Sequence, residues 1–166
     1  KCYYCDFYKT VNSSLREKFV IYLKNEIILR KAFLEDEVVE TIYFGGGTPS
    51  VLTVNELSGI LNAVYDNFRL SDAEITLEAN PDDLTAEYLK DLRSADINRL
   101  SIGIQSFQDV HLKKMNRRHD ARQAVQCVEQ AAQAGFDNIS IDLIYGLPGL
   151  TAAEWESDLN IAFQLP

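Results

Sequence analysis

The chain is short of cysteine, of basic residues and of long apolar runs, and each shortage excludes a class of protein. Three cysteines in 166 residues are an odd number and do not indicate the disulfide framework of a small secreted domain. No apolar run approaches the roughly 20 residues of a membrane span, and no signal peptide is visible. A net charge of −9 argues against a nucleic-acid partner, because such proteins normally carry a basic face. We therefore expect a cytoplasmic protein with no transmembrane segment.

What the chain does contain is enough apolar sequence for one core. Apolar residues make up 46% of it and no low-complexity tract interrupts them, so a single globular unit is expected. The chain starts at Lys1 rather than at a methionine, and it stops at Pro166 after a helix-like run. We therefore expect residues 1–166 to be one domain that is cut at both ends.

Four short β-rich runs alternate with longer helical patterns. The runs cover residues 41–45, 74–80, 99–105 and 138–145. Capping signatures, in which a Glu or Gln follows a Thr or Asp by three residues, predict helix starts after Thr53, Asp120 and Thr151. An earlier helix is expected from about Ser14. Strand–helix–strand at this spacing predicts parallel strands joined by crossover helices.

One face of all four predicted strands is small and polar, whereas the other face is apolar and would pack under the helices. The polar residues gather late in their strands, at residues 45–48, Glu78, Gln105 and Asp142. Barrel enzymes place their chemistry at this carboxyl rim. We predict an α/β fold with a curved parallel sheet, a barrel or an open barrel, whose polar inner face surrounds a ligand. The alternative is a one-sided sheet whose polar face meets water.

Two motifs indicate ligands without identifying them. "YFGGGTPS" (residues 43–50) has three consecutive glycines, which let a backbone approach a ligand closely but also fit a plain strand–helix turn. It is neither a dinucleotide fingerprint nor a P-loop. "CYYC" (residues 2–5) is compatible with half a zinc site, a redox pair, a local coincidence, or an iron–sulfur cluster that lacks one thiolate. Spacing alone ranks zinc and iron–sulfur level.

Six motifs in order along the chain carry a family resemblance. They are "CYYCDF", "YFGGGTPS", "LEANPDDL", "LSIGIQSF", "MNRRHD" and "DLIYGLPG". Together they closely resemble the radical S-adenosylmethionine (SAM) enzymes of the oxygen-independent coproporphyrinogen III oxidase type, a group that includes haem chaperones. The resemblance implies a partial (βα) TIM-like barrel, truncated at both ends. Residues 1–166 would form a single radical SAM core domain, with the first strand and the C-terminal region missing.

The resemblance also answers what "CYYC" is. The family's cluster motif is C-x-x-x-C-x-x-C, and Cys2 and Cys5 match its second and third cysteines, so the first would lie just upstream of Lys1. Cys2 and Cys5 would then be thiolate ligands of a 4Fe-4S cluster. We expect this chain alone neither to hold an intact cluster nor to be catalytic.

Further residues match family positions around S-adenosylmethionine, and the family's reaction is its one-electron reductive cleavage to a 5′-deoxyadenosyl radical. Glu78 and Gln105 match residues near the ribose and the methionine part, and Arg117 matches the arginine that pairs with the cofactor carboxylate. The resemblance assigns further contacts with the cofactor to Tyr4, Gly46, Gly47, Thr48 and Asp142.

The remaining candidates are interpreted as structural. Cys127 lies in an Ala/Val-rich pattern and is expected to be a buried thiol, and Trp155 is expected to pack in an amphipathic helix. His119 belongs to a basic stretch with Lys113, Lys114, Arg118 and Arg122. This stretch is interpreted as a solvated helix end, with attraction of tetrapyrrole propionates as the alternative.

The branch of the family follows from Phe7. The decarboxylating enzymes place a further cysteine at that position, whereas "CDF" resembles the haem chaperones. We therefore favour a protein that holds haem and passes it to a haem-dependent partner. The alternative is a coproporphyrinogen III oxidase, which converts two propionates to vinyl groups. A third hypothesis is a non-catalytic barrel module that binds a small ligand and has no cluster.

Overall fold

The computed structural model describes residues 2–6 and 12–166. Its centre is a four-stranded parallel sheet in which the strands lie in chain order, β1-β2-β3-β4. The strands are β1 (Val38–Phe44), β2 (Arg69–Ala79), β3 (Arg99–Gln105) and β4 (Ile139–Leu143). A doubly wound sheet reverses its strand order near the middle. A sequential order with crossover helices is instead the arrangement of a partial barrel.

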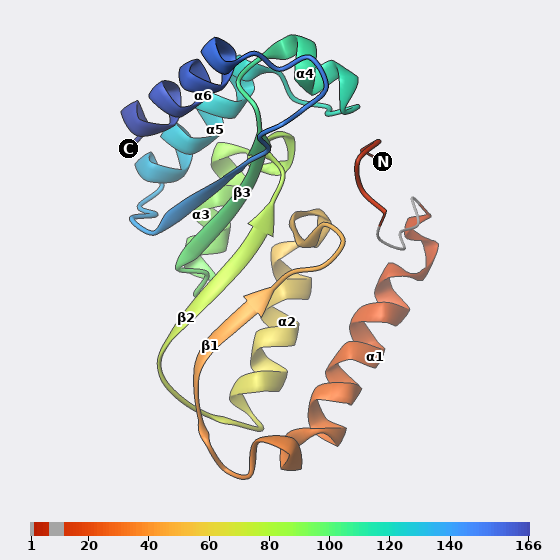
Figure 1. Cartoon of the computed structure of the whole chain (residues 1–166). Coiled ribbons are helices and arrows are strands. Elements are labelled where there is room, and N and C mark those ends of the chain that lie inside the picture. Colours follow the sequence, from red (N-terminus) through yellow and green to blue (C-terminus); the bar gives the residue numbers. More distant parts are fainter. Residues whose placement is uncertain (1, 7–11) are drawn as a thin grey trace.

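Helices connect and flank these strands, as Figure 1 shows. They are α1 (Arg16–Leu29), α2 (Val54–Tyr65), α3 (Ala86–Ser94), α4 (Asp109–Lys114), α5 (Ala121–Gln133) and α6 (Ala152–Gln164). The three predicted capping boxes are present, at Thr53, Asp120 and Thr151. Short 3₁₀ turns precede or follow several elements, among them Pro49–Val51 and Pro81–Asp83. In the described part of the chain, no helix is both long and apolar enough to cross a membrane.

The core lies between one face of the sheet and three helices. Leu57 of α2, Leu89 of α3 and Val128 of α5 are almost fully buried against Leu77 and Ile102 of the sheet. These strand residues come from the predicted apolar register. Helix α1 stands apart from this core and packs along α2, as Figure 1 shows.

The opposite face of the sheet is polar, as predicted. Arg99 donates hydrogen bonds to Thr76 Oγ1 at 3.2 Å and to Ser140 Oγ at 3.1 Å, so its side chain spans β2, β3 and β4. Thr76 is nevertheless buried, because neighbouring polar side chains cover it. The alternation of residue types therefore gave the correct two faces.

Candidate functional site

The carboxyl end of β1 is tied to β2 through Glu78. The Tyr43 hydroxyl donates to Glu78 Oε1 at 2.9 Å, and the Gly46 amide donates to Glu78 Oε2 at 3.2 Å. Glycine is required here for two reasons. A Cβ on Gly45 would lie 2.8 Å from Tyr43 Cε1, and Gly46 has φ of 108°, a conformation that L residues rarely adopt. The glycine run is thus shaped around the Glu78 carboxylate, while Thr48 Oγ1 donates to Gly47 O at 2.8 Å.

Arg117 joins the N-terminal segment to the strand ends. Its Nη1 donates to Cys2 Sγ at 3.5 Å and to the Tyr4 hydroxyl at 3.3 Å. Its Nη2 donates to Asn80 Oδ1 at 2.9 Å and to the Gly103 carbonyl. The guanidinium therefore contacts the N-terminal segment, the loop after β2 and strand β3 at once.

The N-terminal segment has its own anchor beside Arg117. The Tyr3 amide donates to the Met115 carbonyl at 3.1 Å, and the Cys5 amide donates to the Cys2 carbonyl at 3.4 Å. The two cysteines are thus held in one turn, and Cys2 Sγ lies beside Arg117 at the strand ends. Burial raises the pKa of the Tyr4 hydroxyl to about 12, although Arg117 opposes the shift. Tyr4 is therefore a neutral neighbour of Cys2 at physiological pH.

Arg117 is a half-buried cation with a free donor. Among the described residues, no carboxylate lies within ion-pair distance of its guanidinium, and its buried Nε–H has no hydrogen-bond partner. Buried charges are usually paired and buried N–H groups are usually satisfied. The arrangement fits a site for an anionic group from outside the chain.

Negative charge gathers on the same polar face of the sheet, at Glu78 of β2 and Asp142 of β4. Partial burial raises the pKa of Asp142, the Glu78 carboxylate raises it further, and Arg99 opposes both effects. Two carboxylates that repel each other favour a nearby cation or a hydroxyl donor. The rim therefore carries both a cation, Arg117, and an acidic pair, Glu78 and Asp142.

The side chain of Gln105 lies near that of Arg117, over Gly103. Gln105 ends β3 with φ of 75°, and a Cβ added to Gly103 would meet Gln105 Nε2 at 2.7 Å and Arg117 Nη2 at 3.7 Å. Gly103 thus leaves the space that both side chains use. Asn80 and Gly103 both hold Arg117, and sequence reasoning missed both roles. Both lie on the predicted polar face, and no local signal links them to residue 117.

Among the residues expected to be structural, Cys127 agrees with the structure, whereas His119 and Trp155 differ from the expectation. Cys127 is 3% exposed and donates to the Ala124 carbonyl at 3.1 Å, and burial raises its thiol pKa to about 12, so it is a core thiol as expected. His119 is not on a solvated helix end, because it is 3% exposed and its Nε2 donates to the Ile104 carbonyl at 3.0 Å. Burial lowers the pKa of His119. Trp155 is half-buried and lies 6.3 Å from the Tyr145 ring, outside the main core. Phe7 lies outside the described residues.

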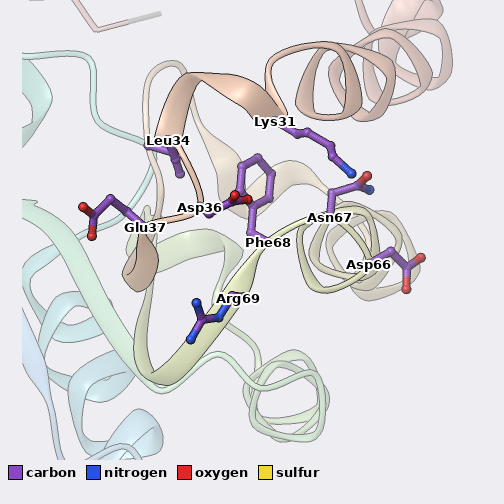
Figure 2. Close-up of a pocket in the computed structure, with 8 residues that line it drawn as sticks. All are labelled: Lys31, Leu34, Asp36, Glu37, Asp66, Asn67, Phe68 and Arg69. Carbon is purple, nitrogen blue, oxygen red and sulfur yellow. The ribbon is translucent and has the colours of Figure 1, made fainter.

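A separate hollow of about 240 Å³ lies near the opposite end of the sheet, where β1 and β2 begin. Figure 2 shows the residues that line it: Lys31, Leu34, Asp36, Glu37, Asp66, Asn67, Phe68 and Arg69. It contains none of the predicted site residues and mixes both signs of charge. Within residues 2–6 and 12–166, no three His, Cys, Asp or Glu side chains converge as a metal site. In the described part of the chain, Cys2 and Cys5 are therefore not part of such a group of three.

Comparisons with known proteins agree with the resemblance read from the motifs. The model of the Radical SAM superfamily matches residues 1–162. Proteins named heme chaperone HemW are similar to the chain. The one from Lactococcus lactis is 42% identical over 99% of this chain and 43% of its own length. The one from Bacillus subtilis is 39% identical over 99% of this chain and 44% of its own length. The chain thus spans less than half the length of these relatives.

Solved structures show the same fold. The radical SAM enzyme coproporphyrinogen III oxidase (HemN) from Escherichia coli superposes with a TM-score of 0.88 at 31% identity, over 99% of this chain and 39% of that one. Elp3 from Methanocaldococcus infernus superposes with a TM-score of 0.70 at 16% identity, over 90% of this chain and 40% of its own, and supports the fold alone. The expected partial TIM-like barrel is confirmed.

Proposed function

Because the chain belongs to the radical SAM superfamily, we propose that it forms the cofactor-binding core of a protein that acts on tetrapyrroles. The cofactors of this family are a 4Fe-4S cluster and S-adenosylmethionine, which are the cofactors expected from the motifs. The observation that carries the proposal is Arg117, a half-buried cation in contact with Cys2, whose Nε–H has no hydrogen-bond partner among residues 2–6 and 12–166. The unpaired cation and the adjacent thiols are suited to an anionic cofactor group beside a metal cluster.

The residues present fit these cofactors. Cys2 and Cys5 would supply two thiolates to the cluster. When bound, the cluster supplies an electron for the reductive cleavage of S-adenosylmethionine. Arg117 would hold the cofactor carboxylate through charge-assisted hydrogen bonds.

The acidic residues of the rim, Glu78 and Asp142, suit the groups of S-adenosylmethionine other than its carboxylate. S-adenosylmethionine carries a positive sulfonium, an ammonium group and ribose hydroxyls, and carboxylates accept hydrogen bonds from hydroxyls and attract cations. Glu78 and Asp142 would occupy these positions with Gln105. Tyr4, Gly46, Gly47 and Thr48 would make the remaining contacts with the cofactor.

We further propose that the full-length protein is a haem chaperone. The curated proteins named HemW reach 42% identity with this chain, whereas HemN is 31% identical in its structural superposition. In this proposal the protein resides in the cytoplasm, binds haem and transfers it to a haem-accepting protein. The second candidate is oxygen-independent coproporphyrinogen III oxidase activity, and the TM-score of 0.88 with HemN favours it.

The test uses the full-length protein, reconstituted with iron and sulfide without oxygen. It receives S-adenosylmethionine, a reductant and coproporphyrinogen III, and porphyrin products are separated by chromatography. Intact substrate beside an assembled cluster, followed by stoichiometric haem binding and transfer to an apo-haemoprotein, supports the chaperone. Divinyl product contradicts it and identifies an oxidase. A colourless protein without iron would instead support a non-catalytic small-ligand-binding module.

A further inference from the structure

We propose that Asp83 is a positioning residue for Arg117, acting through Asn80 and Ser50. This inference rests on the proposed role of Arg117 in holding the carboxylate of S-adenosylmethionine. Neither Asp83 nor Ser50 touches Arg117 in the structure. They fix the side chain that does, and they thereby set where the guanidinium points.

A short chain of hydrogen bonds leads from the guanidinium to Asp83. Arg117 Nη2 donates to Asn80 Oδ1 at 2.9 Å, and Asn80 Nδ2 donates to Asp83 Oδ2 at 3.4 Å. The Ser50 hydroxyl donates to the same Oδ2 at 2.7 Å and accepts from the Asn80 amide N–H at 3.3 Å. Ser50 is 5% exposed, so this junction is shielded from water. The chain of bonds joins the loop after β1 and the loop after β2 to the segment after α4.

Asp83 decides which way the Asn80 amide faces. An amide has an acceptor oxygen on one side and a donor NH₂ on the other. In the observed orientation the oxygen meets the cationic Nη2 and the NH₂ meets the carboxylate. The reverse orientation would set NH₂ against the guanidinium and oxygen against the carboxylate, so both contacts would be repulsive. A carboxylate at residue 83 therefore keeps an acceptor in front of Arg117.

The neighbouring charges leave Arg117 available to a ligand. Arg118 Nη2 pairs with Asp82 at 2.6 Å and with Asp83 at 2.9 Å, from a side chain that is 65% exposed. The two carboxylates thus form their ion pairs with the exposed arginine rather than with the half-buried one. Asp83 orients Arg117 through a neutral amide, and the cationic charge of Arg117 is kept for an anion.

Asp82 provides a matched control, because it lies in the same turn and pairs with the same Arg118. No hydrogen bond is seen from the described residues Ser50 or Asn80 to Asp82. The experiment therefore compares Asp83→Ala with Asp82→Ala in the full-length, cluster-reconstituted protein. Calorimetry measures the affinity for S-adenosylmethionine and for 5′-methylthioadenosine, which keeps the adenosine part and lacks the amino-acid part.

We expect Asp83→Ala to weaken S-adenosylmethionine binding by about 10-fold or more, the size typical when a residue supporting a ligand-binding group is lost. Asp82→Ala should change it by less than about two-fold, as for an exposed ion pair. Binding of 5′-methylthioadenosine should be the same in both variants and the wild type. Asp83→Asn, which keeps an acceptor oxygen, should recover part of the loss. Should Asp83→Ala fail to fold, Ser50→Ala must show the same selective loss.

Three results overturn the positioning role while the proposed function stands. These are wild-type affinity in Asp83→Ala, equal losses in Asp83→Ala and Asp82→Ala, and an equal loss for both ligands. A reconstituted wild-type protein that does not bind S-adenosylmethionine at all overturns the proposed function, and the positioning role with it.

Discussion

Substitution of Asp158 tests how the loop after β3 is anchored to helix α6. This carboxylate is fully buried in α6. It accepts from the Ser106 hydroxyl at 2.7 Å, the Phe107 amide at 3.1 Å and Gln108 Nε2 at 3.0 Å. These three donors directly follow Gln105, so Asp158 fixes the backbone on which that proposed cofactor contact sits.

The magnitude of an Asp158→Ala change follows from the donors it leaves behind. Ser106 and the Phe107 amide are buried and would each lose an acceptor at about 1–3 kcal/mol, whereas the half-buried Gln108 can turn to water. Relief from burying a charge offsets part of this. We expect the free energy of unfolding to fall by about 3 kcal/mol, which corresponds to about 6–12 °C in Tm for a chain of this size.

Urea denaturation followed by circular dichroism measures this change, with Glu156→Ala as the control. Glu156 is exposed on the same helix, and its removal should change stability by less than about 0.5 kcal/mol. Asp158→Asn keeps the shape and one acceptor oxygen and should fall between the two. If Asp158→Ala and Glu156→Ala were equally stable, the buried carboxylate would not anchor the loop after β3, and the reasoning would be refuted.

Three further predictions concern single residues. Gly103→Ala should push Gln105 aside, because the added Cβ meets its Nε2 at 2.7 Å; calorimetry should show weaker S-adenosylmethionine binding at nearly unchanged Tm, and unchanged binding would contradict this. Native-state alkylation with mass spectrometry should leave Cys127 unmodified, since burial raises its pKa to about 12, and should modify it only after unfolding. Burial alone would raise the pKa of Glu56, but hydrogen bonds from Thr53 and the ion pair with Arg16 together outweigh burial and lower the pKa. The stability Glu56 adds is therefore present above its unfolded pKa and lost as pH falls through the lowered folded pKa. The wild type should have a larger free energy of unfolding than Glu56→Gln, and this difference should shrink as the pH is lowered. A difference that does not change with pH would show that ionisation of Glu56 does not stabilise the fold.

Features with a local signal were predictable from the sequence. The alternation of residue types in β3 set its two faces, and its predicted bounds match those observed. Helix α3 was missed, because Thr85 caps it by accepting from the Tyr88 amide without a Glu or Gln to complete a capping box. The start of β2 at Arg69 was also missed, since Asp72 has φ of 41° and interrupts the strand pattern.

The partners of Arg117 were beyond sequence reasoning for a different reason. Asn80 and Gly103 lie 37 and 14 residues away from it along the chain. Their roles depend on the parallel register that sets Ala79 beside Ile102. The motif resemblance identified Arg117 itself, but a motif states which residues occur and not which of them hold one another. Only the packed strand ends bring the three together.

The adjacent residues Arg117 and Arg118 show how an acidic chain can keep a cation available. The chain has 25 acidic against 16 basic residues, and Arg118 forms ion pairs with two carboxylates. Arg117 is instead held by an amide oxygen, a carbonyl, a phenol and a thiol. None of these acceptors is a carboxylate, and they compensate only part of the loss of hydration, so this arrangement reduces the stability of the ligand-free protein. In the proposed function, an anionic ligand that binds Arg117 would recover this lost free energy. The separation of Arg117 from the carboxylates would therefore favour ligand binding at the rim.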